Sequence, residues 1–233
     1  MTQIKIDTIK MEPSIRRLRE DISRVNTSAL KLTHKQKFDI WVRNLDSILD
    51  QIKKINEFVL PQMEKDLGFP FSNRNLIVIA FVQPSLKNII KEIKVHLTNE
   101  PSFKIWEEKL TKLGATPDTA KSIAWVGDTA IKYALLTEIW RPGITPKELH
   151  NKRQALEKNE NLSKLCDDWD LFDNRIHFDP NVPKDKTKQK IEGTLTEAMF
   201  GVIFIERGIA GVQKALHLID TSRTTNNPES VID

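Results

Sequence analysis

The chain has 233 residues, of which 39% are hydrophobic and 29% are charged, as is usual for a globular protein of one or two domains. Its formal net charge of +4 suits a polyanionic partner but does not require one. Cys166 is the only cysteine, which excludes a disulfide framework and a multi-cysteine zinc site. The first residues lack the apolar core of a signal peptide, and no apolar run reaches membrane-spanning length. We therefore expect a cytoplasmic protein with no membrane partner.

Apolar residues recur at helical spacing throughout the chain, and no segment alternates as a strand would, so the sequence predicts an all-α fold. The first helix is expected over 13–26. Thr33 is the expected N-cap of a long helix over 33–59, whose apolar residues follow an a/d-like repeat. Such a helix is either a coiled-coil arm or, as we favour, part of a helical hairpin packed on its own domain.

Further helices are expected in the rest of the chain, bounded by proline, glycine and capping signals. They cover 75–81, 86–96, 102–113, a segment around Asp128 that follows a turn over 114–119 and ends near Arg141, a segment capped by Thr145 and Glu148, a segment containing Glu160, a segment around Glu197 that ends at Gly208, and 210–219. The polar, proline-containing segment 172–190 is predicted to be a loop. The polar tail 221–233 is predicted to be disordered.

Two apolar helical stretches each contain a single carboxylate, Asp128 within 123–136 and Glu197 within 193–204. An isolated ionised carboxylate in an apolar setting costs several kcal/mol unless it is paired or bound to a cation. If the two helices pack together, the two acids could share a divalent metal. Alternatively, each acid is satisfied by a neighbouring base or backbone N–H. Lys121 and Lys132 are both within helical reach of Asp128.

Other polar residues give weaker signals. Glu160 is a third candidate metal ligand, although a solvated helix acid is the commoner explanation of such a residue. The basic residues form two groups: Lys147, Lys152 and Arg153, and Lys184, Lys186, Lys188 and Lys190. They would contact phosphates if they flanked the acids, and would otherwise be solvated surface. The sequence contains no HExxH motif, Gly-rich phosphate loop or nucleophile elbow, so covalent nucleophilic catalysis has little support.

Four segments, in a fixed order, carry a resemblance to a known family. They are residues 71–86, 121–128 (KSIAWVGD), 152–162 and 194–204 (TLTEAMFGVIF). Together they resemble the ribonuclease III catalytic domain, whose signature reads ERLEFLGD and whose last helix reads D-x-x-E-A-x-x-G-A-x-Y/F. The resemblance implies a helical endonuclease domain over 67–220 with an insertion before the signature. A helical extension over 1–66 would precede it, and no double-stranded-RNA-binding domain is expected.

The chain departs from the family at its acids. Four acids build the family's magnesium site, and at those positions this chain has Ala124, Asp128, Thr194 and Glu197. The resemblance implies that Asp128 and Glu197 are the catalytic residues and hold the metal. Glu160 matches an acid that is common in the family's middle segment and is a further candidate ligand. Thr194 is a candidate contact for a metal-bound water.

The resemblance implies a homodimeric endoribonuclease that uses Mg²⁺ or Mn²⁺ to cleave double-stranded RNA, as in RNA processing. The alternative is a catalytically inactive ribonuclease III fold that serves as an RNA-binding or dimerisation scaffold. Two missing acids and Lys121, which replaces the signature's first Glu, fit that alternative. A third possibility is a helical protein–protein adaptor that works through the 33–59 helix. RNA retention that weakens steeply with salt separates the first two functions from the third.

Overall fold

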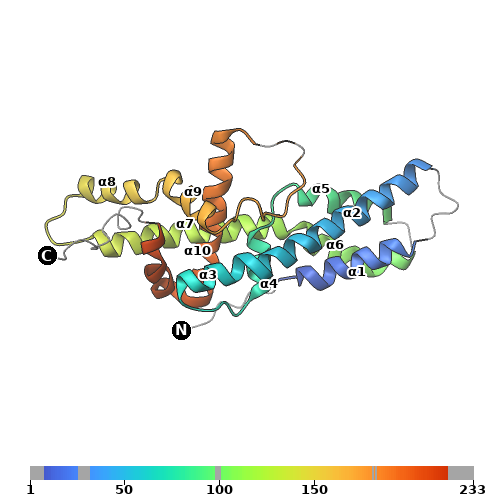
Figure 1. Cartoon of the computed structure of the whole chain (residues 1–233), viewed down its shortest axis with the longest axis horizontal. Coiled ribbons are helices and arrows are strands. Elements are labelled where there is room, and N and C mark those ends of the chain that lie inside the picture. The colour runs from blue at the N-terminus through green and yellow to red at the C-terminus, as the bar shows by residue number, and fades with distance from the viewer. Residues whose placement is uncertain (1–7, 26–31, 98–100, 180, 182, 220–233) are drawn as a thin grey trace, which may run out of the picture. The chain divides into compact units, whose positions relative to one another are not determined.

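A computed structural model describes residues 8–25, 32–97, 101–179, 181 and 183–219 (Figure 1). Within these ranges the elements are helices, and the one extended pairing is a parallel bridge between Val82 and Ile176. The predicted all-α fold is therefore confirmed. None of the described helices combines the length and apolarity that crossing a bilayer requires. The predicted disordered tail lies outside the described residues.

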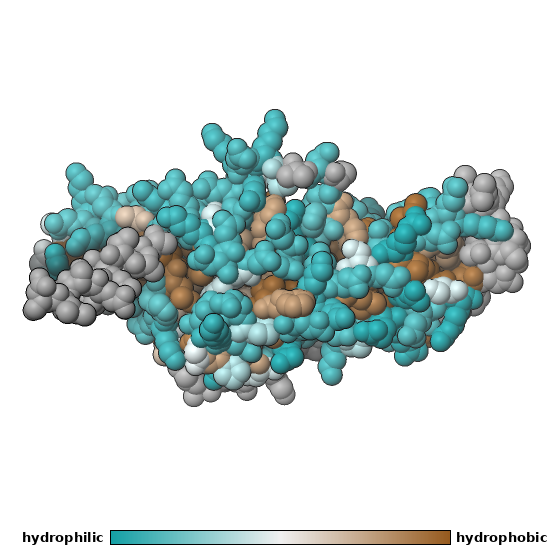
Figure 2. Space-filling model, in the orientation of Figure 1, coloured by the Kyte–Doolittle hydropathy of each residue, from teal (hydrophilic) through white to brown (hydrophobic). Residues whose placement is uncertain are grey.

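The chain divides into two compact units. Unit 1 is Met1–Ser122 with Asp173–Val182, and unit 2 is Ile123–Phe172 with Pro183–Asp233. The domain boundary that the sequence places between residues 66 and 67 stays a prediction. The surface drawn in Figure 2 is mostly hydrophilic, because amphipathic helices turn their apolar stripes inward.

The described residues of unit 1 form six complete α-helices and the first turns of a seventh. The six are α1 (Met11–Ser23), α2 (Leu32–Lys54), α3 (Leu60–Leu67), α4 (Arg74–Ala80), α5 (Leu86–Leu97) and α6 (Glu107–Gly114). A π-helical turn, Ile55–Val59, joins α2 to α3, and a 3₁₀ turn, Pro101–Trp106, precedes α6.

Helices α1 and α2 pack against each other. The buried stripe of α1 follows the predicted helical spacing: Met11, Ile15, Leu18 and Ile22. Arg19 of α1 also pairs with Asp46 of α2 at 2.9 Å. This contact supports the helical-hairpin interpretation of the long helix over the coiled-coil arm. Helix α2 begins at Leu32, so Thr33 lies inside the helix and the prediction that it is the N-cap was wrong.

Unit 2 contains the rest of α7 (Thr116–Ile139), α8 (Pro146–Leu156), α9 (Asn159–Asp168), α10 (Asp185–Ala215) and a 3₁₀ turn, Leu216–Leu218. The capping box of Thr145 and Glu148 is present at the start of α8, as predicted. Helix α10 breaks at Gly208, whose φ of 67° favours glycine, and this break was also predicted. Helices α9 and α10 pack together, and the buried Thr196 hydroxyl donates to the Leu162 carbonyl at 2.9 Å.

Two further local predictions were wrong. Helix α7 begins at Thr116, inside the predicted turn over 114–119, because Pro117 lies in the first helical turn, where proline is tolerated. Helix α10 begins at Asp185, so 185–190 are helical and the predicted loop ends earlier. An acid in the first turn stabilises a helix N-terminus. Lys188 also pairs with the buried Glu192 one turn later, at 3.1 Å.

Candidate metal centre

The candidate site forms where α7 and α10 cross in unit 2. A Cβ atom added to Gly127 would collide with the carbonyl oxygen of Glu197 and lie 2.5 Å from the backbone nitrogen of Gly201. A Cβ atom added to Gly201 would collide with the carbonyl oxygen of Ile123. The two backbones are therefore in direct contact, which glycine permits because it has no side chain.

This backbone contact brings the two predicted acids together. Asp128 follows Gly127 directly on α7, and Glu197 lies one turn before Gly201 on α10. The negative charge of Asp128 helps to raise the pKa of Glu197, so the two carboxyl groups lie close enough to interact. The arrangement on which the metal hypothesis depends, two acids on packed helices, is present.

The two acids have different surroundings. Burial raises the pKa of Glu197 to about 7, the charge of Asp128 adds to the rise, and Lys132 opposes it. The Glu197 carboxyl makes no hydrogen bond or ion pair with any residue that the structure describes. Asp128 accepts a hydrogen bond from Lys132 at 2.7 Å, and its side chain is 29% exposed. Glu197 is thus the isolated acid that the sequence predicts, whereas Asp128 is partly solvated and paired.

The acid pair fits a divalent cation only together with other ligands. Mg²⁺ is commonly bound by one or two carboxylates plus substrate phosphates. A cation would also offset the repulsion that disfavours the ionised form of Glu197. In the described part of the chain, no three His, Cys, Asp or Glu side chains gather into a metal-binding group. Solvent or substrate oxygens would therefore have to complete the coordination.

The other positions implied by the resemblance lie near this pair in sequence but differ in burial. Ala124, one turn before Asp128, is 3% exposed, whereas Thr194, three residues before Glu197, is exposed. Glu160 is exposed in the first turn of α9, where an acid also stabilises the helix N-terminus. The roles of Glu160 and Thr194 at a metal stay predictions.

Most of the predicted RNA-binding residues are exposed, and two of them are held in ion pairs. Arg153 pairs with Glu157 at 3.0 Å, and Lys188 pairs with Glu192 at 3.1 Å. The Lys188 ammonium also lies 5.1 Å from the centre of the Phe172 ring. The exposed residues lie on α8 or around the start of α10: Lys147, Lys152, Lys184, Lys186 and Lys190. Contacts between these residues and RNA stay predictions.

Sequence reasoning missed Gly127 and Gly201, and it missed the exposure of aromatic residues on α7. The signal for the glycines was present, because a glycine inside a helix costs about 1 kcal/mol relative to alanine unless packing requires it. Trp125 and Tyr133 are 74% and 58% exposed although they belong to an apolar stretch. Helical spacing alone does not separate a face buried in its own domain from a face available to another chain.

Comparison with protein-family models identifies the domain that contains this site. The model described as Ribonuclease III domain matches residues 121–208, which include both acids and both glycines. No curated protein and no solved structure matched the chain in the corresponding comparisons. Residues 121–208 are therefore similar to the ribonuclease III domain, with Ala124 and Thr194 at two of the four positions where the resemblance places acids.

Proposed function

We propose that the chain is a divalent-metal-dependent endoribonuclease that cleaves double-stranded RNA. The ribonuclease III domain indicates the family of double-stranded-RNA endoribonucleases. The observation that carries the proposal is the pairing of Asp128 with Glu197, which the contact between Gly127 and Gly201 holds in place. Two neighbouring acids, one of them half-buried with its pKa raised to about 7, form a costly arrangement that a bound cation would stabilise.

Asp128 and Glu197 would hold Mg²⁺ or Mn²⁺ jointly with phosphate oxygens of the RNA. When bound, such a cation activates water for attack on the phosphodiester and stabilises the leaving oxygen. Lys132, whose side chain is 40% exposed beside Asp128, balances the charge of the acid pair before RNA binds. Glu160 and Thr194 are proposed as additional polar contacts around the reacting phosphate.

Basic residues of α8 and of the start of α10 are proposed to contact the RNA backbone. Double-stranded RNA is recognised mainly by its shape and through its 2′-hydroxyl and phosphate groups. Exposed lysines supply the positive charge that such contacts need without reading base sequence. The proposed residues are Lys147, Lys152, Arg153, Lys184, Lys186, Lys188 and Lys190.

A homodimer is part of the proposal, and exposed apolar surface in unit 2 supports it. Trp125, Tyr133 and Trp140 are 74%, 58% and 62% exposed, and their spacing places them along one side of α7 and its end. Helix α8 has no buried residue, and isolated helices of this length are marginal in water. A second copy of the chain would cover aromatic side chains that otherwise face solvent.

Replacing Trp125 by alanine should weaken the homodimer by about thirtyfold, because truncating a buried interface tryptophan commonly costs about 2 kcal/mol or more. Sedimentation equilibrium over a range of concentrations measures the dissociation constant. The matched control is Phe58→Ala, which removes an aromatic side chain of unit 1 that is 69% exposed. A monomeric wild type, or equal weakening by both substitutions, would contradict this interface.

Incubation with labelled double-stranded RNA and Mg²⁺ or Mn²⁺ tests the cleavage itself. Wild type should produce fragments with 5′-phosphate and 3′-hydroxyl ends, and Asp128→Asn and Glu197→Gln should each lose at least about a hundredfold in rate. Glu138→Gln, which neutralises an exposed acid of α7, is the matched control and should cleave like wild type. Cleavage that persists in both acid variants would exclude this site.

A second candidate function is an RNA-binding or dimerisation scaffold without cleavage. The ion pair of Lys132 with Asp128 at 2.7 Å favours it, because this pair satisfies one acid without a metal. Wild type that leaves RNA intact with either metal, while it dimerises and retains RNA, would establish the scaffold. Failure to retain RNA at low salt would leave the protein–protein adaptor.

A further inference from the structure

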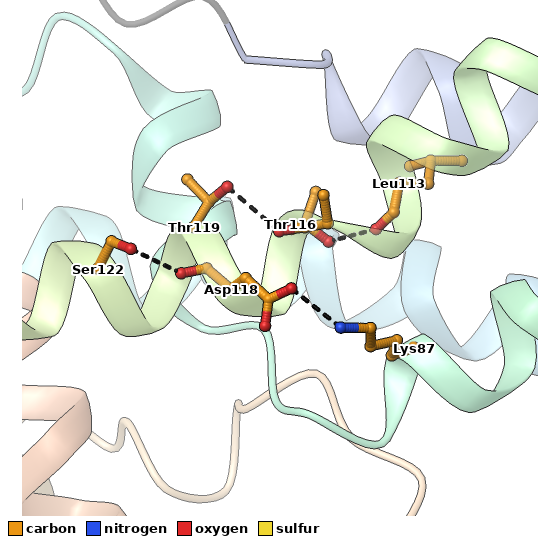
Figure 3. Close-up of polar contacts among 7 residues, drawn as sticks. Lys87, Leu113, Thr116, Asp118, Thr119 and Ser122 are labelled. Atoms are coloured by element: carbon orange, nitrogen blue, oxygen red, sulfur yellow. Dashed lines mark hydrogen bonds and ion pairs between the residues drawn. The ribbon is translucent and has the colours of Figure 1, made fainter.

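A groove runs between α5 and α6 in unit 1 and continues to the first turn of α7. Lys94 of α5 donates to the Thr111 hydroxyl of α6 at 2.9 Å. Ile90, one turn earlier on α5, lies beside Gly114, one turn later on α6, so the two packed helices are antiparallel. Figure 3 shows the second polar contact, in which Lys87 of α5 pairs with Asp118 of α7 at 3.0 Å. The groove between the two contacts has a volume of about 240 Å³.

The rim of this groove is strongly basic. Lys87, Lys91 and Lys94 line it from positions i, i+4 and i+7, which lie on one side of a helix. Among the described lining residues, Asp118 is the single acid. The floor is apolar, since Ile90 is 1% exposed and lines the groove beside the lysines. An anionic ligand would therefore contact the basic rim and lie along the groove.

Two of the three lysines, Lys91 and Lys87, are available to a ligand. Lys91, between the two contacts, is exposed and makes no hydrogen bond or ion pair with any residue in the described ranges. Lys87 and Asp118 have side chains that are 56% and 69% exposed, and ion pairs of this kind contribute only about 0–1 kcal/mol. Lys87 can therefore exchange Asp118 for a phosphate at little cost.

We propose that the groove lined by Lys87, Lys91 and Lys94 is a second contact surface for the RNA backbone, outside the matched segment 121–208. The identity of the polyanion rests on the proposed function. Lysines repeated once per helical turn stand about 5–6 Å apart, which is comparable with the step between successive phosphates along a strand. Each ammonium group binds phosphate as a point charge, so the surface adds affinity without sequence preference. Helix α5 would thus add contacts to the RNA backbone from outside the matched segment.

The test compares two triple variants of the full chain that remove the same charge. Lys87→Gln with Lys91→Gln and Lys94→Gln alters the groove, and Lys53→Gln with Lys54→Gln and Lys65→Gln alters exposed lysines of α2 and α3. Glutamine has nearly the helix propensity of lysine, so both variants should fold. Fluorescence anisotropy of labelled double-stranded RNA, in EDTA to prevent cleavage, gives the affinity at several salt concentrations.

The groove variant should bind RNA at least about tenfold more weakly. The slope of log K against log salt concentration should become less negative by about two. The control variant should stay within about twofold of wild type. Lys91→Glu alone, which disturbs no contact in the described structure, should reproduce part of the loss. Equal effects of the two triple variants, unchanged binding by the groove variant, or wild type that binds no RNA would each overturn the proposal. Polyglutamate serves as a second probe in the same assay. If the groove variant loses binding to polyglutamate while its RNA binding is unchanged, the proposal is overturned in favour of an acidic protein partner.

These results separate the groove from the cleavage activity. Wild type that binds RNA through the groove but does not cleave it with Mg²⁺ or Mn²⁺ would contradict the proposed endoribonuclease and leave the groove intact. Wild type that cleaves RNA while the groove variant binds like the control would contradict the groove alone.

Discussion

Replacing Gly127 or Gly201 by alanine should lower the free energy of unfolding of unit 2 by at least about 3 kcal/mol, because the added methyl group meets backbone rather than side-chain atoms. The obstructing atoms are the carbonyl oxygens of Glu197 and Ile123. A flexible side chain could turn away from a new methyl group. A carbonyl inside a helix can yield only if the whole helix moves, so α7 and α10 would have to separate.

Urea unfolding followed by circular dichroism measures this loss as a lower transition midpoint. Gly193→Ala is the matched control, because Gly193 lies on the same helix and its added Cβ atom would be 3.1 Å from the side-chain oxygen of Asn159. That oxygen can shift, and alanine raises helix propensity by about 1 kcal/mol, so the control should be neutral or stabilising. Midpoints that fall equally in all three variants would contradict the helix crossing described above.

The same substitutions connect the fold to the site. If α7 and α10 separate, Asp128 moves away from Glu197. Any effect of a divalent cation on the melting temperature should then become smaller, because the two acids no longer bind the same ion. The acids themselves are untouched in these variants. A cation effect that decreases in the glycine variants would indicate a site built by two helices. A cation effect that stays unchanged would indicate two carboxylates that act independently.

Signals carried by residues close together in sequence were predicted well. The capping box of Thr145 and Glu148 and the break at Gly208 each depend on a few neighbouring positions. The ion pair between Asp128 and Lys132 was one of the alternatives, because residues four apart on a helix meet side by side. The order of four short segments was enough to predict the ribonuclease III domain, which the family model confirms.

Features that depend on contacts between distant segments were not predicted. Gly127 and Gly201 are 74 positions apart, and only the crossing of their helices shows why neither tolerates a side chain. Trp125 is apolar and at helical spacing, yet it is 74% exposed, because periodicity does not identify which face a domain leaves to a partner. The start of α10 was missed because the polar composition before Glu192 outweighed the local ion pair with Lys188.

The raised pKa of Glu197 predicts a pH-dependent stability that Glu197→Gln should remove. Its pKa is about 7 in the folded chain and about 4.5 ordinarily, so between these values the folded state binds the proton more tightly. Stability should therefore fall as the pH rises from about 4.5 to 7, with the full cost present above pH 7. Glutamine is neutral throughout. Relative to wild type, the variant should melt about 2–4 °C higher at pH 8 and nearly equally at pH 5, and Glu138→Gln should show no such difference.

A divalent cation should reverse this cost, because it binds the ionised form of the acid pair and not the protonated form. Mn²⁺ should raise the melting temperature of wild type at pH 8, should have little effect at pH 5, and should have little effect on Glu197→Gln at either pH. Melting curves at both pH values, with and without Mn²⁺, contain the whole comparison. Equal stabilisation of wild type and Glu197→Gln by Mn²⁺ would place the cation elsewhere. A pH effect without a cation effect would mean that Asp128 is satisfied by its ion pair with Lys132 and that Glu197 binds no metal.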